Sequence, residues 1–104
     1  MEIILAVFRN EDEYRKIKGD SVADRLPWSD HCGLLPNAIK DLTKHGYKCN
    51  VETCDLHGYQ SFLDRNGAKN CPQNTAAYVA AKYHNAIEED YSVLKDINIT
   101  IVKD

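Results

Sequence analysis

The sequence predicts a single α/β domain spanning residues 1–104, in which three mainly parallel strands form one sheet with helices on both faces. Three observations support this prediction: an apolar run close to the first residue, apolar–polar alternation in two later segments, and helical spacing of apolar residues between them. A chain of 104 residues has room for one hydrophobic core.

The first predicted strand is Glu2–Phe8, in which six of seven residues are apolar. A strand with one wet face alternates apolar and polar residues, whereas an uninterrupted run of this length suits a strand covered on both faces. We therefore expect this strand at the centre of the sheet.

The stretch at about residues 10–33 is predicted to be an inserted loop or lid. A short helix is expected over residues 10–18, ended by Gly19, and the chain then passes through Pro27 and the single tryptophan, Trp28. A strand and its following helix are usually joined by a few residues, so about two dozen residues indicate a lid over a site or a binding loop.

The next helix has a marked start and stop. Leu35, Ile39 and Leu42 recur at helical spacing, Pro36 fits the first turn, and Gly46 fits the position after the end.

A second strand is predicted over residues 47–55. Tyr47, Cys49, Val51 and Thr53 share one face, and the other face is more polar. One apolar face is typical of a strand near the edge of a sheet.

Two helices and a last strand complete the predicted order. A short helix over residues 58–66 ends at Gly67, and a longer helix is capped by Asn74 or Thr75 and reaches about Glu89. The apolar stripe of the longer helix is Ala76, Val79, Ala80, Tyr83 and Ile87.

The last predicted strand, Ile97–Ile101, alternates strictly. Right-handed crossovers then give the strand order 2-1-3, with the first strand in the middle. An antiparallel last strand is the alternative, since its alternation suits a mixed sheet.

Composition and charge exclude several classes of protein. The hydrophobic content of 43% and the charged content of 28% are those of a globular protein. The net charge of −3 comes without the clustered cations that duplex nucleic acid requires, so we expect no nucleic-acid partner. Without a signal-peptide pattern or an apolar run of membrane-spanning length, the sequence predicts a cytoplasmic protein, no membrane association, and reduced cysteines.

The predicted topology gives a place for a binding site. Ligands of open α/β sheets bind beyond the carboxyl ends of the strands, and the long loop can fold over that point. The candidate ligand- or partner-binding residues are Arg9, Glu11, Trp28, Asp30, His31, Asp55 and His57.

Three of these candidates also have ordinary structural explanations. Arg9 can form a surface ion pair with the acidic residues that follow it. Asp55 can cap the next helix, and Trp28 can pack into the core.

The cysteines and histidines do not form a recognisable metal or redox motif, so we predict no metal and no cofactor. Cys-x2-Cys is absent, although Cys54 and His57 have the spacing of half a zinc site. Cys49 and Cys54 should point to opposite faces of a strand. The glycine-rich phosphate-binding motifs are also missing.

The absence of a catalytic motif favours a non-catalytic interaction module, an adaptor, regulator or inhibitor that binds a protein partner. Its predicted acidic and aromatic surface is made of Tyr14, Trp28, Tyr47, Tyr59, Tyr91 and the acidic residues 88–90. One alternative is a small-molecule- or nucleotide-binding or hydrolytic domain, in which Arg9 holds an anionic group and Asp55 or His57 is the acid or base. The other alternative is a zinc- or thiol-dependent site.

Overall fold

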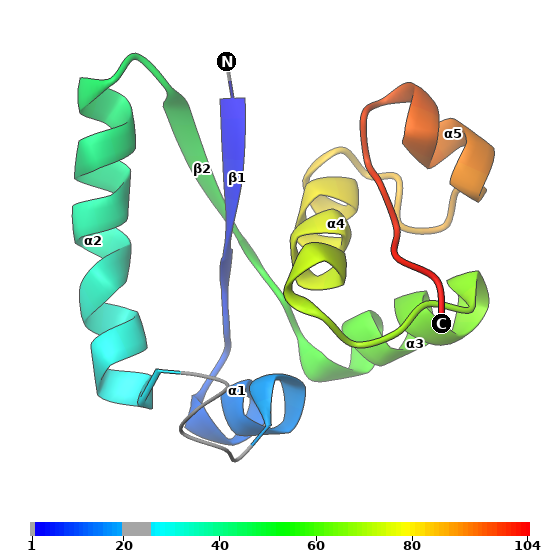
Figure 1. Ribbon diagram of the computed structural model, residues 1–104, viewed down its shortest axis with the longest axis horizontal. Coiled ribbons are helices and arrows are strands. Elements are labelled where there is room, and N and C mark those ends of the chain that lie inside the picture. Colours follow the sequence, from blue (N-terminus) through cyan, green and yellow to red (C-terminus); the bar gives the residue numbers. More distant parts are fainter. Residues whose placement is uncertain (1, 20–25) are drawn as a thin grey trace.

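The computed structural model describes residues 2–19 and 26–104, which form a mixed α/β structure (Figure 1). Its elements are β1 (Glu2–Val7), α1 (Glu11–Lys18), α2 (Trp28–Lys44), β2 (Lys48–Thr53), α3 (Leu56–Asn66), α4 (Pro72–Tyr83) and α5 (Tyr91–Asp96). Figure 1 views the sheet nearly edge-on, with α2 on one side of the strands and α4 on the other. The predicted layering of helices on both faces of a sheet is therefore present.

β1 and β2 pair in parallel, in a register that runs from Glu2 opposite Lys48 to Val7 opposite Thr53. The connection between them contains α1 and α2, as a parallel pair requires. Ile4, Ala6 and the following Phe8 pack toward the core. Because side chains alternate along a strand, Leu5 points to the other face.

The predicted third strand is not formed, and the sheet of the described residues has two strands. Ile97 ends α5, and Asn98 adopts a left-handed backbone conformation with φ +64°, which interrupts an extended segment. Ile99 and Ile101 are 4% exposed and join the core instead of lying beside β1 in a sheet. The alternation thus identified buried residues but not strand pairing.

The core lies on the α4 side of the sheet. Its largest fully buried side chains are Tyr59, Phe62, Val79, Tyr78 and Leu94, which come from α3, α4 and α5. The ring of Tyr78 lies 5.4 Å from that of Phe62 and 5.8 Å from that of Tyr59, measured between centroids.

The expectation that the first strand is central is wrong for the described residues, and the helices on the two faces of the sheet leave this strand only partly covered. Glu2 is exposed, every residue from Ile3 to Val7 is only partly buried, and Phe8 is the first buried residue. α2, the helix that faces the other side of β1, has no buried residue, and its Leu34 is 51% exposed. With two strands in the sheet, β1 is an edge strand.

The stretch predicted as a lid holds helical structure. α1 matches the helix expected over residues 10–18, with Asn10 as its N-cap. α2 begins at Trp28, so Pro36 lies inside the helix and not in its first turn. The part of the predicted lid at residues 20–25 lies outside the described residues.

The end of α3 at Gly67 is confirmed, and the bounds of α4 differ from the prediction. Gly67 has the left-handed conformation of a helix end, with φ +58°. α4 starts at Pro72 after Cys71, and it ends at Tyr83, with His84 as its C-cap, instead of about Glu89. α5 was not predicted. The buried side of α4 also differs from the predicted stripe and consists of Asn74, Thr75, Ala77, Tyr78, Val79 and Ala81.

Candidate functional site

One edge of β1 is unpaired within the part of the chain that the structure describes. The N–H of Cys54 donates to the C=O of Val7 at 2.7 Å, so the backbone polar groups of Val7 point toward β2. Successive residues of a strand direct these groups to opposite sides, and those of Leu5 therefore also point toward β2. The N–H and C=O groups of Ile4 and Ala6 point away from β2, to the open edge.

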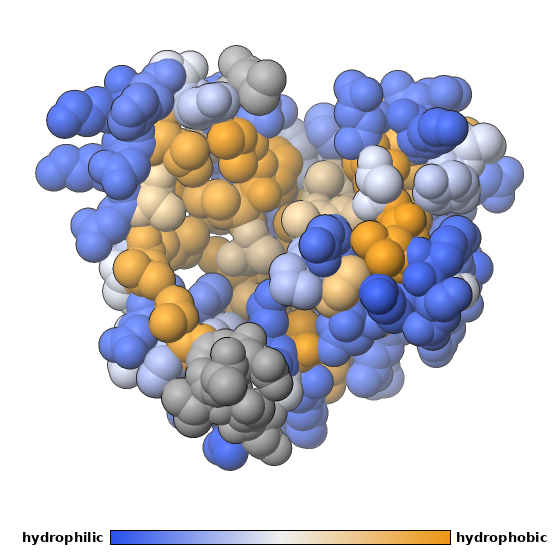
Figure 2. Space-filling model, in the orientation of Figure 1, coloured by the Kyte–Doolittle hydropathy of each residue, from blue (hydrophilic) through white to orange (hydrophobic). Residues whose placement is uncertain are grey.

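A groove runs along this open edge. It comprises cavities of about 700, 280 and 200 Å³ that share the β1 backbone as their floor. We call it the β1 groove. Its floor is Ile3–Ala6. The wall on the α2 side consists of His31, Leu34, Leu35 and Ala38. The wall on the α4 side consists of Pro72, Gln73, Ala76 and Ala80, and residues 97–100 lie at one end. Figure 2 shows hydrophobic residues gathered in the hollow between these two walls.

The two ends of the β1 groove carry different charged groups: Glu2, 3.9 Å from the Nζ of Lys48, lies at one end, and Lys18 lies at the other. At the start of β1, the Glu2 carboxylate accepts hydrogen bonds from Asn50 at 2.9 Å and Tyr83 at 3.2 Å. At the other end, the half-buried Lys18 places its Nζ atom 5.9 Å from the centroid of the Phe8 ring. Burial lowers the pKa of Lys18, because charge is costly to hold away from water.

An aromatic cluster fixes the end of the groove near Lys18. His31 stacks on Tyr14 with centroids 4.7 Å apart, and it lies 5.3 Å from Phe8 and 5.9 Å from Trp28. Burial, together with the charge of Lys18, lowers the pKa of His31. The predicted lid residues Trp28 and His31 therefore belong to the first turns of α2 and pack against β1 and α1. For Trp28, the structure agrees with packing against the core.

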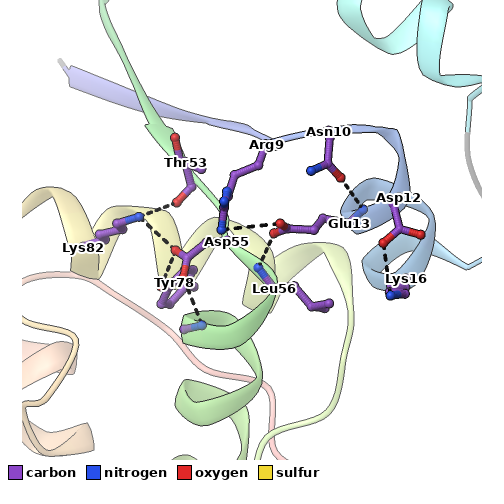
Figure 3. A network of polar contacts seen from close by, with 11 residues as sticks. Arg9, Asn10, Asp12, Glu13, Lys16, Thr53, Asp55, Leu56, Tyr78 and Lys82 are labelled. Carbon is purple, nitrogen blue, oxygen red and sulfur yellow. Dashed lines mark hydrogen bonds and ion pairs between the residues drawn. The ribbon is translucent and has the colours of Figure 1, made fainter.

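A polar network joins the strand ends to the helices (Figure 3). Arg9 lies 3.5 Å from Glu13 in an ion pair between residues one helical turn apart, and its side chain is 62% exposed. The second carboxylate oxygen of Glu13 accepts a hydrogen bond from the N–H of Leu56 at 2.8 Å. Glu13 thus links α1 to the start of α3.

Asp55 is the centre of this network. Its carboxylate accepts hydrogen bonds from the N–H of Gly58 at 3.0 Å, the hydroxyl of Tyr78 at 2.8 Å and the Nζ of Lys82 at 2.9 Å. Burial by itself would raise the pKa of Asp55, but the bonds from Lys82, Tyr78 and Gly58 outweigh it and lower the pKa to about 2. Asp55 is the N-cap of α3 and stays ionised at neutral pH, so it is no proton donor there.

The other predicted site residues do not join a common concavity. His57, Glu11 and Asp30 are exposed in the first turns of α3, α1 and α2. Neither Arg9 nor Asp55 nor His57 lines the cavities of the β1 groove. The structure brings together Trp28 and His31 and separates them from the Asp55 network.

The residues that sequence reasoning missed are the groove residues Lys18, Leu34 and Ala76. One signal could have pointed to them: Glu2–Phe8 has the composition of a central strand, so an uncovered edge beside it would be a recognition surface. The same composition also fits a strand that is buried within its own chain, which is the interpretation given in the sequence analysis.

The thiols show no reactive or metal-binding arrangement in the described part of the chain. All four cysteines are free, and burial raises the pKa of Cys54 to about 12, which keeps this thiol protonated. Cys54 is fully buried, whereas His57 is exposed. Among the described residues, no three His, Cys, Asp or Glu side chains are grouped so that they could hold a metal ion.

The fold and the groove define a class: a mixed α/β protein with a short parallel sheet, in which one edge of the apolar first strand pairs with none of the described residues. Comparisons of the chain with protein-family models, curated proteins and solved structures found no match. No helix formed by the described residues combines the length and apolar character that crossing a membrane requires.

Proposed function

We propose that this chain is a non-catalytic protein-binding module, acting as an adaptor, regulator or inhibitor, and that it binds an extended segment of a protein partner in the β1 groove. One observation carries the proposal: β1 is apolar from Ile3 to Val7, yet it has an open edge and no fully buried residue. Proteins usually shorten, charge or cover such an edge, because it pairs readily with other chains. A segment bound beside β1 would supply the missing strand and make β1 central.

The groove offers both parts of strand recognition. The free N–H and C=O groups of Ile4 and Ala6 can pair with the backbone of an added strand. Alternate side chains of that strand would contact the two walls, where Leu34 and Ala76 are exposed. Backbone pairing gives affinity and the walls give specificity.

The proposed partner surface differs from the acidic and aromatic surface that the sequence predicts. Tyr14 and Tyr59 are 2% and 1% exposed, so they belong to the core and cannot anchor a partner. Tyr91 is exposed, but the Nζ of Lys103 lies 5.0 Å from its ring centroid. Tyr14 and Trp28 pack with Phe8 and His31 beside the groove, Tyr59 and Tyr91 lie elsewhere, and the apolar surface that we propose for a partner is the groove.

Selection of peptides from a phage-displayed library of random decapeptides tests the proposed function. We expect enrichment of peptides that alternate apolar and polar residues, and binding of their synthetic copies at micromolar concentration, measured by fluorescence anisotropy. Leu34→Asp places a charge in the wall of the groove and should weaken binding about tenfold or more. Leu34 is 51% exposed, so the variant should fold.

Val93→Asp is the matched control. Val93 is 40% exposed on α5, outside the groove, and its substitution should leave binding unchanged. If no peptide is enriched, or if Leu34→Asp binds as tightly as Val93→Asp does, the proposed function is wrong.

A further inference from the structure

The β1 groove contains a cation that lacks a counter-charge among the described residues. Lys18 is half-buried in the last turn of α1, and no carboxylate in the described part of the chain forms an ion pair with it. Lys16, two residues earlier, is 58% exposed and pairs with Asp12 at 3.0 Å. The ammonium group of Lys16 is therefore solvated and paired with a carboxylate, whereas that of Lys18 is less solvated and has no carboxylate partner among the described residues.

The groups around Lys18 do not neutralise it. Phe8 lies beneath its ammonium group, and His31 lines the same cavity of about 280 Å³. The thiols of Cys54 and Cys71 are the other titratable groups that affect it. Burial lowers the pKa values of both Lys18 and His31, as expected where a positive charge has no partner.

The groove continues past Lys18. A further cavity, of about 450 Å³, lies between residues 16–19 and residues 70–72. Lys18 and Pro72 line both this cavity and the groove cavity of about 280 Å³. A segment in the groove can thus extend beyond Lys18 without ending there. A side chain within the segment, and not a chain terminus, is the group that would reach the ammonium.

We propose that the segment bound in the β1 groove carries an aspartate or glutamate side chain that pairs with Lys18. This inference rests on the proposed function and adds the chemistry of the partner: an extended apolar segment with an acidic residue at a fixed position. At the opposite end of the groove Lys48 already lies 3.9 Å from the carboxylate of Glu2, whereas Lys18 lacks a carboxylate among the described residues, so the position of Lys18 fixes that of the partner's carboxylate.

The test uses synthetic decapeptides of alternating valine and threonine, acetylated and amidated, in which one glutamate is moved through every position. Each peptide has a counterpart with glutamine in place of glutamate. For one position we expect the glutamate peptide to bind about tenfold more tightly than the glutamine peptide. Lys18→Met should abolish this preference, and Lys95→Met, at an exposed position of α5 outside these cavities, should retain it.

Salt dependence on the unaltered chain provides a readout that needs no variant. Binding of the preferred glutamate peptide should weaken as salt increases, and binding of its glutamine counterpart should change little. Equal binding of the two peptides at every position, or a glutamate preference that survives Lys18→Met, would overturn the inference. A preference for peptides with a free carboxyl terminus over all amidated peptides would assign Lys18 to a chain end and also overturn it.

Failure of the proposed function gives a different result. In that case neither glutamate nor glutamine peptides bind the unaltered chain better than they bind Leu34→Asp. Self-association measured by sedimentation, if lost in Ala6→Pro, would assign the groove to a second copy of the chain and contradict a separate partner. Ala6→Pro removes an N–H from the open edge and leaves the pairing with β2 intact.

Discussion

Asp55 shows how a single side chain can connect three elements. It follows β2, caps α3 and accepts hydrogen bonds from Tyr78 and Lys82 of α4. Gly58 has to be glycine for the same reason, because a Cβ atom there would collide with the Tyr78 hydroxyl and the Asp55 carboxylate. The sequence offered this cap as the structural alternative to a binding role for Asp55, on residue type and position, and the cap is formed. It could not show the two α4 partners, which lie more than 20 residues away.

The pKa of Asp55 makes its contribution to stability depend on pH. Its pKa in the folded chain, about 2, is below its ordinary value of 3.8. The folded state therefore favours the ionised form, and the stabilisation is fully present above about pH 4 and is lost as the pH falls toward 2.

Asp55→Ala should lower the free energy of unfolding by about 2 kcal/mol at pH 7, because the cap and two charge-assisted hydrogen bonds are lost. The difference from the unaltered chain should be smaller at pH 3, as urea denaturation at both pH values would show. Asp64→Ala, at an exposed position of α3, is the control and should change stability by less than about 0.5 kcal/mol. A loss of equal size at the two pH values would contradict this account.

At the scale of elements, periodicity predicted the paired strands, the positions of α1 and α3, and the second half of α2, whose start at Trp28 it missed. It failed for the buried face of α4, where Asn74 and Thr75 are buried, and for the strand pairing of the segment after α5. Asn74 is fully buried and holds this last segment: its side-chain amide donates to Val102 at 2.8 Å and to Lys69, and its oxygen accepts the N–H of Val102 at 2.8 Å. An apolar-stripe argument counts such a residue as exposed.

Asn74→Ala should therefore be among the most destabilising substitutions in α4, at about 3 kcal/mol, because the C=O of Lys69 and the N–H of Val102 lose their side-chain partner and the C=O of Val102 loses one of its two donors. Urea denaturation monitored by circular dichroism measures the effect. The neighbouring Gln73 is exposed, and Gln73→Ala should have little effect on stability. Similar stability of the two variants would show that Asn74 does not hold the last segment in place.

At the scale of the whole molecule, packing is uneven. The side containing α3, α4, α5 and the final segment has a buried core, whereas α2 and β1 have no fully buried residue. The sequence predicted the layers of the fold, because each element's own pattern indicates which face is apolar. It could not predict which apolar face the chain leaves uncovered, since that depends on whether residues 97–101 pair with β1.

The position of the predicted site depends on the same strand order. A strand order of 2-1-3 predicts a binding site at the carboxyl ends of the strands. Arg9 and Asp55 lie there, in a network of ion pairs and hydrogen bonds that joins the strand ends to the helices. With two strands in the sheet, the recognition surface that we propose is the edge of β1 itself.

Backbone hydrogen exchange at β1, followed by NMR with and without the preferred glutamate peptide, tests this claim most directly. In the free chain the amides of Ile4 and Ala6 should exchange faster than those of Leu5 and Val7, which point toward β2. Added peptide should slow exchange at Ile4 and Ala6 by about tenfold or more, as expected for amides that become paired. Exchange at Ile4 and Ala6 that is already as slow as at Leu5 and Val7 in the free monomer, or that stays fast when the peptide is bound, would contradict an open edge that binds a partner strand.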